Sequence, residues 1–258
     1  MRIVVLVKHV PDALAAPALT GDHRVDRTGP GLLSELDEYP LEVARSLVAE
    51  HGGEAIALAM GPADAETAVR RALALGADRG VLVTDDSLTG SDAIATARVL
   101  AGAVTALGGV DLVLAGDASP DGATGLIPTL VAALLGLPAL RGLVHLTVDD
   151  AVATGRRPDE RAIETLTAGL PALASVTDRG PAPRYPTFMQ VRAARTKPIE
   201  LWDLSATGVP AAAVGTAGAR TQVLDSAPLP RRPPGERIVD DGTAGERLVA
   251  FLARHQIV

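Results

Sequence analysis

Apolar segments with the length of β-strands alternate with helical patterns through the first half of the chain. The strand-like segments are rich in Val, Ile, Leu and Ala and show little polar alternation, which is typical of strands buried on both faces. They cover residues 2–8, 54–60, 80–83 and 110–115, and the helical patterns cover residues 37–50, 62–75, 92–107 and 126–135. Because such alternation builds right-handed βαβ units, the sequence predicts a parallel sheet with helices on both faces.

The second half of the chain follows a different pattern. Short strand-like segments separated by turns are expected to add antiparallel strands to an edge of the sheet; they cover residues 143–148, 161–166 and 172–177. Residues 206–242 are rich in proline and have no period, and an amphipathic helix is predicted over 246–254. We therefore predict an α/β, doubly wound, mostly parallel, Rossmann-like (adenine-nucleotide-hydrolase-like) domain over residues 1–205 and an extended arm over 206–258 that docks on a partner.

Composition excludes several classes of protein. Aromatic residues make up only 2% of the chain and the net charge is −7, which together argue against nucleic-acid binding. There is no cysteine, so disulfides, thiolate nucleophiles and iron–sulfur clusters are excluded. The sequence has no signal-peptide pattern and no apolar run of 18 residues. We therefore expect a cytoplasmic protein that is not embedded in a membrane.

A glycine-rich loop follows the fourth predicted strand. It runs from Gly116 to Gly125 and leads into a predicted helix, an arrangement that directs free backbone N–H groups toward a phosphate. Its place beyond the carboxyl end of a parallel strand favours a ligand site, because ligands of such sheets bind at that edge. The loop contains neither a Gly-Lys-Ser/Thr nor a Gly-x-Gly-x-x-Gly motif, so an ordinary strand-to-helix turn remains the alternative.

No pattern in the sequence predicts catalysis or metal binding. The five histidines are scattered without the spacing of metal ligands, and no nucleophile elbow surrounds Ser119. The pair Asp85–Asp86 is interpreted as a solvated turn, with a metal site as the alternative. We therefore predict neither catalytic residues nor a metal site.

Several local motifs, spread over nearly the whole chain, resemble those of one family. The chain resembles the β subunits of electron-transferring flavoproteins (ETF), which include the FixA-type proteins. The segments that carry the resemblance are Val5–Asp12, Leu36–Glu42, Gly61-Pro62 with Arg71–Gly80, Asp121–Gly125, Leu135–Pro138 and Pro183–Tyr185.

The resemblance implies a non-catalytic electron carrier that pairs with a larger α subunit. FAD would be held mainly by the α subunit, accept electrons from flavin dehydrogenases of the acyl-CoA dehydrogenase type, and pass them to a quinone oxidoreductase or another acceptor. The β subunit would bind AMP in a structural role, or a second FAD in an electron-bifurcating member. A free-standing nucleotide-binding protein or hydrolase of the same fold remains the alternative, and the C-terminal arm favours the subunit.

The resemblance also implies where the nucleotide would bind. It is expected beyond the ends of the first, second and fourth strands. The expected contacts are Leu6, Ser34, Met60, Gly116, Asp121, Gly122, Ala123, Thr124, Gly125 and Ile127. The family loop carries a basic residue and Gln where this chain has Asp117 and Ala118. AMP, a second FAD and no nucleotide all remain open, with AMP favoured over a second FAD.

A second implied site is a partner-recognition segment that begins at Pro183. Its expected contacts are Arg184, Tyr185, Phe188 and Arg192. Phe188 takes the position of the side chain that anchors the family's segment in a dehydrogenase pocket, with basic residues around it. The alternative is that Phe188 and Val191 form the buried face of a short helix.

Overall fold

The structure, a computed structural model, describes residues 1–12, 14, 18–227, 229–230, 232 and 234–257. It divides into two units, Met1–Leu224 and Asp225–Val258. The two units are described separately below.

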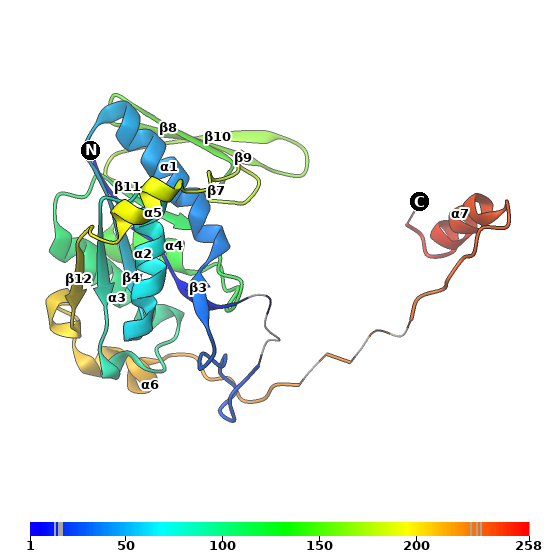
Figure 1. Ribbon diagram of the computed structural model, residues 1–258, viewed down its shortest axis with the longest axis horizontal. Coiled ribbons are helices and arrows are strands. Elements are labelled where there is room, and N and C mark those ends of the chain that lie inside the picture. Colours follow the sequence, from blue (N-terminus) through cyan, green and yellow to red (C-terminus); the bar gives the residue numbers. More distant parts are fainter. Residues whose placement is uncertain (13, 15–17, 228, 231, 233, 258) are drawn as a thin grey trace. The chain divides into compact units, whose positions relative to one another are not determined.

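A seven-stranded parallel sheet forms the centre of the first unit (Figure 1). The strand order is β12-β5-β4-β1-β6-β11-β7. The strands are β1 (Arg2–Leu6), β4 (Glu54–Met60), β5 (Arg79–Val83), β6 (Leu112–Gly116), β7 (Ala139–Leu143), β11 (Ala172–Val176) and β12 (Ile199–Trp202). The predicted doubly wound, Rossmann-like α/β fold is confirmed.

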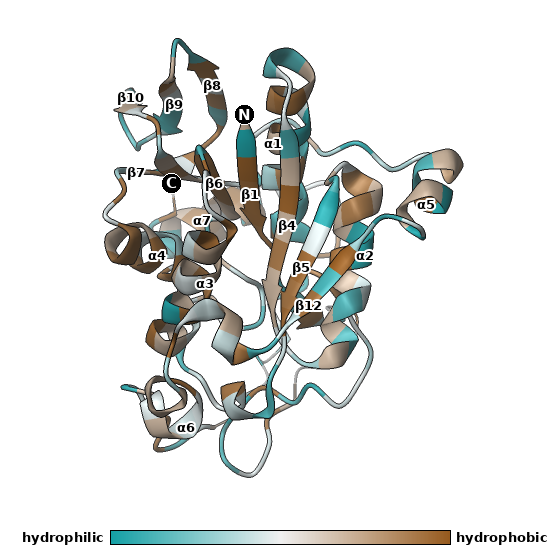
Figure 2. Cartoon of the chain, turned by 90° about the vertical axis from the view of Figure 1, so that its left-hand side faces the viewer, coloured by the Kyte–Doolittle hydropathy of each residue, from teal (hydrophilic) through white to brown (hydrophobic). Residues whose placement is uncertain are grey.

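Helices cover both faces of this sheet. The longer ones are α1 (Glu35–His51), α2 (Glu66–Leu75), α3 (Ala93–Leu107) and α4 (Ile127–Leu135). Alternate residues of β1 enter two separate cores: Ile3 and Val5 pack with α1 and α2, whereas Val4 and Leu6 pack with α3 and α4. Figure 2 shows the central strands as apolar over most of their length. Burial on both faces explains why these strands carry no polar alternation in the sequence.

The strands of the second half are arranged differently from the prediction. Strands β8 (His145–Asp149), β9 (Val152–Pro158) and β10 (Ile163–Gly169) are antiparallel, but they form a sheet of their own instead of extending the central one. Gly155 of β9 lies against the side chain of Leu143, where a Cβ atom would lie 2.5 Å from Leu143 Cδ1. The small sheet can therefore lie directly on β7.

Strand β11 was expected at an antiparallel edge, yet it lies inside the central sheet, parallel to β6 and β7. All five of its residues are buried, as in the other central strands. Strand β7 was not predicted, and neither was the small hairpin of β2 (His9–Pro11) and β3 (Gly31–Leu33). The strands of the hairpin have three residues each and are too short to leave a periodic signal, whereas Arg141 and Gly142 interrupt the apolar run of β7.

Residues 203–221 pack against the rest of the first unit. Thr207 is buried, and its carbonyl oxygen lies where a side chain at Gly102 of α3 would be. The Asp92 carboxylate accepts hydrogen bonds from the backbone N–H groups of Arg220 and Thr221, at 2.7 and 3.0 Å. The sequence places the domain boundary after residue 205, whereas in the structure residues 206–224 belong to the first unit.

The second unit contains helix α7 (Ala244–Arg254). Its apolar side chains Leu248 and Val249 are 50% and 61% exposed. Among the helices of the described residues, none is both long and apolar enough to cross a bilayer.

Candidate functional site at the carboxyl edge

The order of the strands changes direction at β1. The chain passes from β1 to β4 on one side, and β6 later pairs with β1 on the other. The carboxyl ends of β1, β4 and β6 therefore open onto the crevice where doubly wound sheets bind ligands. Leu6, Met60 and Gly116 are the last residues of these three strands, so the structure brings these predicted contacts to one edge.

A buried carboxylate joins the loop after β6 to the segment after β1. Lys8 Nζ lies 2.8 Å from Asp121 Oδ1 and 3.1 Å from Ser119 Oγ. The Arg27 guanidinium pairs with the other oxygen of Asp121, whose side chain is only 5% exposed. Burial by itself would raise the pKa of Asp121, but the hydrogen bond and charge of Lys8, with further hydrogen bonds from Arg27 and Ser119, outweigh it and lower the pKa to about 2. Asp121 is therefore ionised, and it fixes the loop to β1.

A second buried carboxylate lies beneath the loop. Asp37, in the first turn of α1, accepts a hydrogen bond of 2.7 Å from the backbone N–H of Lys8. Burial raises the pKa of Asp37 to about 8, and the charge of Asp121 acts in the same direction. A Cβ atom at Gly116 would lie 2.8 Å from Asp37 Oδ1 and 3.0 Å from the Leu36 carbonyl oxygen. This close approach explains why glycine ends β6.

Ser34 precedes α1 and is completely buried. Its backbone N–H donates to the Lys8 carbonyl oxygen at 2.9 Å, which places it at the same edge. Its Oγ has no hydrogen-bond partner within the part of the chain that the structure describes. A buried hydroxyl without a partner is costly, so this oxygen is a candidate for a bond to a bound group.

Asp117 does not leave an uncompensated negative charge in the loop. Its Oδ1 accepts hydrogen bonds from Arg141 Nη2 at 3.0 Å and from Ser175 Oγ at 2.8 Å. The same guanidinium donates to the Gly125 carbonyl oxygen and to Thr129 Oγ1, both at 2.9 Å. Arg141 therefore neutralises Asp117 and also fixes the far end of the loop.

The backbone of the loop turns sharply before α4. Ala123 and Gly125 have positive φ angles of 47° and 59°. The N–H groups of Gly122 and Ala123 are used within the loop, by Asp121 Oδ1 and the Ser119 carbonyl oxygen, each at 2.8 Å.

Donors for a phosphate remain at the end of this loop. Thr124 is exposed, and its N–H and that of Gly125 donate to no other group among the residues described. Ile127 follows as the first residue of α4. These amide and hydroxyl donors at a helix start fit a phosphate group.

Part of this site could not be found from sequence motifs. Lys8 and Asp37 lie in two of the segments that carry the family resemblance, but neither they nor Arg27 belong to a general ligand-binding motif. Arg141 lies on β7, a strand that the sequence does not reveal. No group of three acidic or histidine side chains suited to a metal occurs among the described residues.

The predicted recognition segment forms a short helix. Helix α5 (Phe188–Ala194) begins with a capping box between Thr187 and Gln190. Phe188 is 80% exposed and Val191 39%, so they do not form a buried face. The buried residue of α5 is Ala194.

The other predicted contacts of the recognition segment are also exposed. Tyr185 is 90% exposed, and Arg192 lies exposed in the last turn of α5. Arg184 Nε pairs with Glu42 Oε1 at 2.9 Å.

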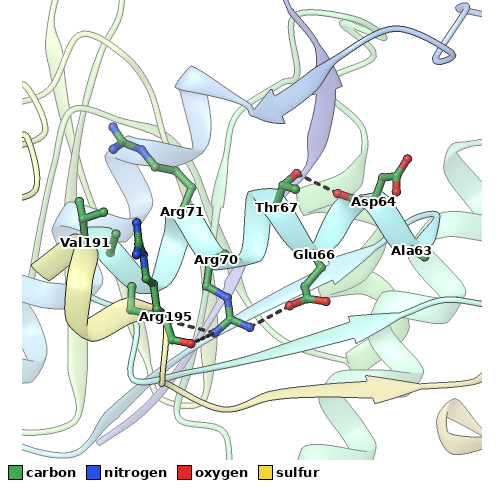
Figure 3. A pocket seen from close by; sticks show the side chains of 10 residues that line it. Ala63, Asp64, Glu66, Thr67, Arg70, Arg71, Val191 and Arg195 are labelled. Atoms are coloured by element: carbon green, nitrogen blue, oxygen red, sulfur yellow. Dashed lines mark hydrogen bonds and ion pairs between the residues drawn. The ribbon is translucent and has the colours of Figure 1, made fainter.

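A groove of about 500 Å³ is lined by residues of both α2 and α5 (Figure 3). Three arginines line it, Arg70 and Arg71 from α2 and Arg195 from the end of α5. None of the predicted nucleotide contacts lines this groove. None of the four predicted recognition contacts lines it either.

The chain is similar to known proteins of one family. Residues 22–207 match the family described as Electron transfer flavoprotein domain. The whole chain is 39% identical to the electron transfer flavoprotein subunit beta of Mycobacterium leprae, covering 99% of that protein. It is 32% identical to the caffeyl-CoA reductase-Etf complex subunit CarD of Acetobacterium woodii over 92% of each protein. It is 34% identical to protein FixA of Azorhizobium caulinodans, over 81% of this chain and 77% of the relative.

Proposed function

Because this chain belongs to the electron transfer flavoprotein family and is related along its whole length to β subunits, we propose that it is the β subunit of a heterodimer. In this role it is an electron carrier and catalyses no reaction of its own. The similarity over 100% of the chain and 99% of the relative is the observation that carries the proposal.

The proposed cofactor is one FAD, held chiefly by the α subunit. The flavin supplies the redox chemistry: it accepts electrons from a flavin dehydrogenase of the acyl-CoA dehydrogenase type and releases them to a quinone oxidoreductase or another acceptor. The part assigned to this chain is to help hold the flavin domain and to offer α5 to the dehydrogenase. The exposure of Phe188 and Tyr185 supports this second role.

The carboxyl edge is the proposed site of AMP. Thr124, Gly125 and the start of α4 would bind the phosphate through neutral donors, and the orphaned Ser34 hydroxyl is a further candidate contact. Lys8, Arg27 and Arg141 are paired with Asp121 and Asp117. They therefore shape the loop and are not assigned to the phosphate. AMP is proposed to have a structural role.

The unit Asp225–Val258 is the proposed docking arm for the α subunit. Helix α7 has exposed apolar side chains at Leu248 and Val249. A helix with such a face is stabilised when it packs against a partner.

Co-expression with the α subunit tests the proposal. The expected product is a stable heterodimer with one FAD per pair, measured by size-exclusion chromatography with light scattering and by flavin absorbance. Expression of the chain alone is the control, and it should yield a protein without flavin. A chain that alone binds FAD tightly, or that alone hydrolyses nucleotides, would favour a free-standing protein of the same fold.

A further inference from the structure

Helix α5 is held in place mainly by polar contacts. It has seven residues, and the single buried one is Ala194. A helix of this length is not stable on its own, and burying one alanine side chain stabilises it only slightly. The position of α5 on the first unit must therefore depend on hydrogen bonds to its neighbours.

Arg70 of α2 binds the carboxyl end of α5 (Figure 3). Its Nη1 lies 3.0 Å from the Ala194 carbonyl oxygen and 2.8 Å from that of Lys197, with a longer contact of 3.4 Å to that of Arg195. Its Nη2 pairs with Glu66 Oε1 at 2.8 Å, which orients the guanidinium. Carbonyl groups at the end of a helix have no partner within the helix, so one side chain here satisfies several of them.

Lys197 makes the reciprocal contact. Its Nζ lies 3.2 Å from the Leu73 carbonyl oxygen and 2.6 Å from that of Ala77, at the carboxyl end of α2. Each helix thus has its end bound by a cation from the other segment, which also suits the negative end of each helix dipole. We call these contacts of Arg70 and Lys197 the α2–α5 clamp.

We propose that Arg70 and Lys197 are positioning residues that hold α5 in place, so that the exposed Phe188 is presented to the dehydrogenase in a preorganised position. This inference rests on the proposed role of α5 in partner recognition. The clamp fixes one end of α5, and the capping box of Thr187 and Gln190 orders the other. Preorganisation raises affinity because the partner does not have to order the helix on binding.

The test uses Arg70→Met in the complete heterodimer, with Arg71→Met as matched control. Arg71→Met removes the same charge from the same helix and the same groove. The Arg71 side chain, however, pairs with Glu38 at 3.1 Å and makes no hydrogen bond to any described residue of α5. The heterodimer is the varied substrate of an acyl-CoA dehydrogenase reduced by its acyl-CoA. The apparent affinity falls in proportion to the fraction of the heterodimer in which α5 is ordered. If this fraction is about one fifth in Arg70→Met, the KM for the heterodimer rises about fivefold and kcat is unchanged. Arg71→Met should stay near the wild type.

Hydrogen exchange provides a readout that is independent of electron transfer. The amides of Val191 to Ala194 should exchange faster in Arg70→Met and in Lys197→Met, and at the wild-type rate in Arg71→Met. Lys197→Met removes the other half of the clamp, so this variant replaces Arg70→Met in the test if Arg70→Met does not fold. Unchanged exchange in both clamp variants would overturn the inference.

Phe188→Ala separates the inference from the proposed function. If Phe188→Ala raises KM and the double variant with Arg70→Met is no worse, the clamp acts through Phe188 as proposed. If Phe188→Ala raises KM but Arg70→Met does not, the clamp is refuted and the recognition role stands. If Phe188→Ala leaves KM unchanged, the recognition role of α5 is itself refuted.

Discussion

Asp37 and Asp121 lie at the same edge of the sheet, yet their surroundings shift their pKa values in opposite directions. Asp37 is buried and accepts from a backbone N–H, so burial dominates and raises its pKa to about 8. Asp121 is also buried, but Lys8 and Arg27 outweigh burial and lower its pKa to about 2. Two features account for the difference: Asp37 is the more deeply buried of the two, and a neutral N–H compensates a negative charge far less than two cations do.

Asp37→Asn should change how stability depends on pH. The folded pKa of Asp37 lies above the unfolded value near 3.9, so the folded state holds an extra proton between about pH 4 and 8. The free energy of unfolding of the wild type should therefore fall across this window and level off above pH 8. Asn keeps the acceptor for Lys8 and does not ionise. The advantage of the variant should grow by up to about 1.4 kcal/mol per pH unit, measured by denaturant unfolding at pH 5 and pH 8.

Asp121→Asn is the control of opposite sign. Because the folded pKa of Asp121 is depressed, its stabilising effect is present above the unfolded pKa and is lost as the pH falls from about 4 to 2. Its own titration therefore adds no pH dependence between pH 5 and 8. Because loss of its charge also lowers the pKa of Asp37, the cost of Asp121→Asn relative to the wild type should shrink slightly as the pH rises toward 8. Parallel pH profiles for the wild type and Asp37→Asn would contradict the assignment of Asp37.

Thr124→Val should lower the AMP content of the purified heterodimer. The substitution removes the hydroxyl donor at the end of the loop and keeps the shape of the side chain. Thr124→Ser, which keeps the hydroxyl, should retain AMP. Bound nucleotide is released by heat and quantified by mass spectrometry. Equal AMP content in the Val variant and the wild type would argue against this placement of the phosphate.

At the scale of elements, long apolar runs were predictable and paired side chains were not. Strands β1, β4 and β6 and their following helices have enough buried residues to be read from the sequence. Strand β7 has the sequence ALRGL, in which Arg141 and Gly142 interrupt the apolar pattern. Arg141 interrupts it because it binds Asp117 in the loop after β6. Arg141 therefore compensates the charge of Asp117, and the same residue makes β7 unrecognisable as an apolar strand in the sequence.

The position of β11 could not be derived from local pattern either. Its apolar run has the same composition as the other central strands, so composition does not distinguish its place in the sheet. The chain reaches β11 only after the separate sheet β8–β10, and it then enters the central sheet between β6 and β7. The glycines, Thr124 and the strand ends of the candidate site were expected from the family resemblance, and the loop also because it follows a predicted strand. Lys8, Arg27 and Asp37 contribute through contacts between segments far apart in sequence, which a single sequence does not reveal.

Removal of residues 225–258 should weaken the heterodimer and leave the first unit intact. This segment forms a unit of its own, and its helix α7 exposes apolar side chains. The dissociation constant of the heterodimer should rise, while the thermal unfolding of the remaining chain stays close to that of the full chain. Analytical ultracentrifugation and calorimetry measure the two effects.

A longer deletion, of residues 206–258, is the control for this experiment. It also removes Thr207 and Val214, which are buried in the first unit. We therefore expect it to lower the unfolding temperature as well as the affinity for the α subunit. If the shorter deletion alone destabilised the first unit, the docking role of the arm would be contradicted.

At the scale of the whole molecule, the proposed tasks are assigned to separate parts of the chain. In this proposal the carboxyl edge would hold a nucleotide, α5 would meet the dehydrogenase, and Asp225–Val258 would dock on the α subunit. No residue in this scheme touches a reacting bond. The account therefore predicts that substitutions in this chain change affinities and association rates, and leave the flavin chemistry itself unchanged.

The central claim is that this chain completes an electron carrier. Stopped-flow absorbance of the reconstituted heterodimer, mixed with an acyl-CoA dehydrogenase reduced by its acyl-CoA, tests it most directly. The account predicts rapid reduction of the heterodimer's FAD, which slows when Phe188 is replaced by Ala and does not occur when either subunit is omitted. Flavin reduction at the same rate by the α subunit without this chain, or no reduction of a heterodimer that contains FAD, would contradict the account.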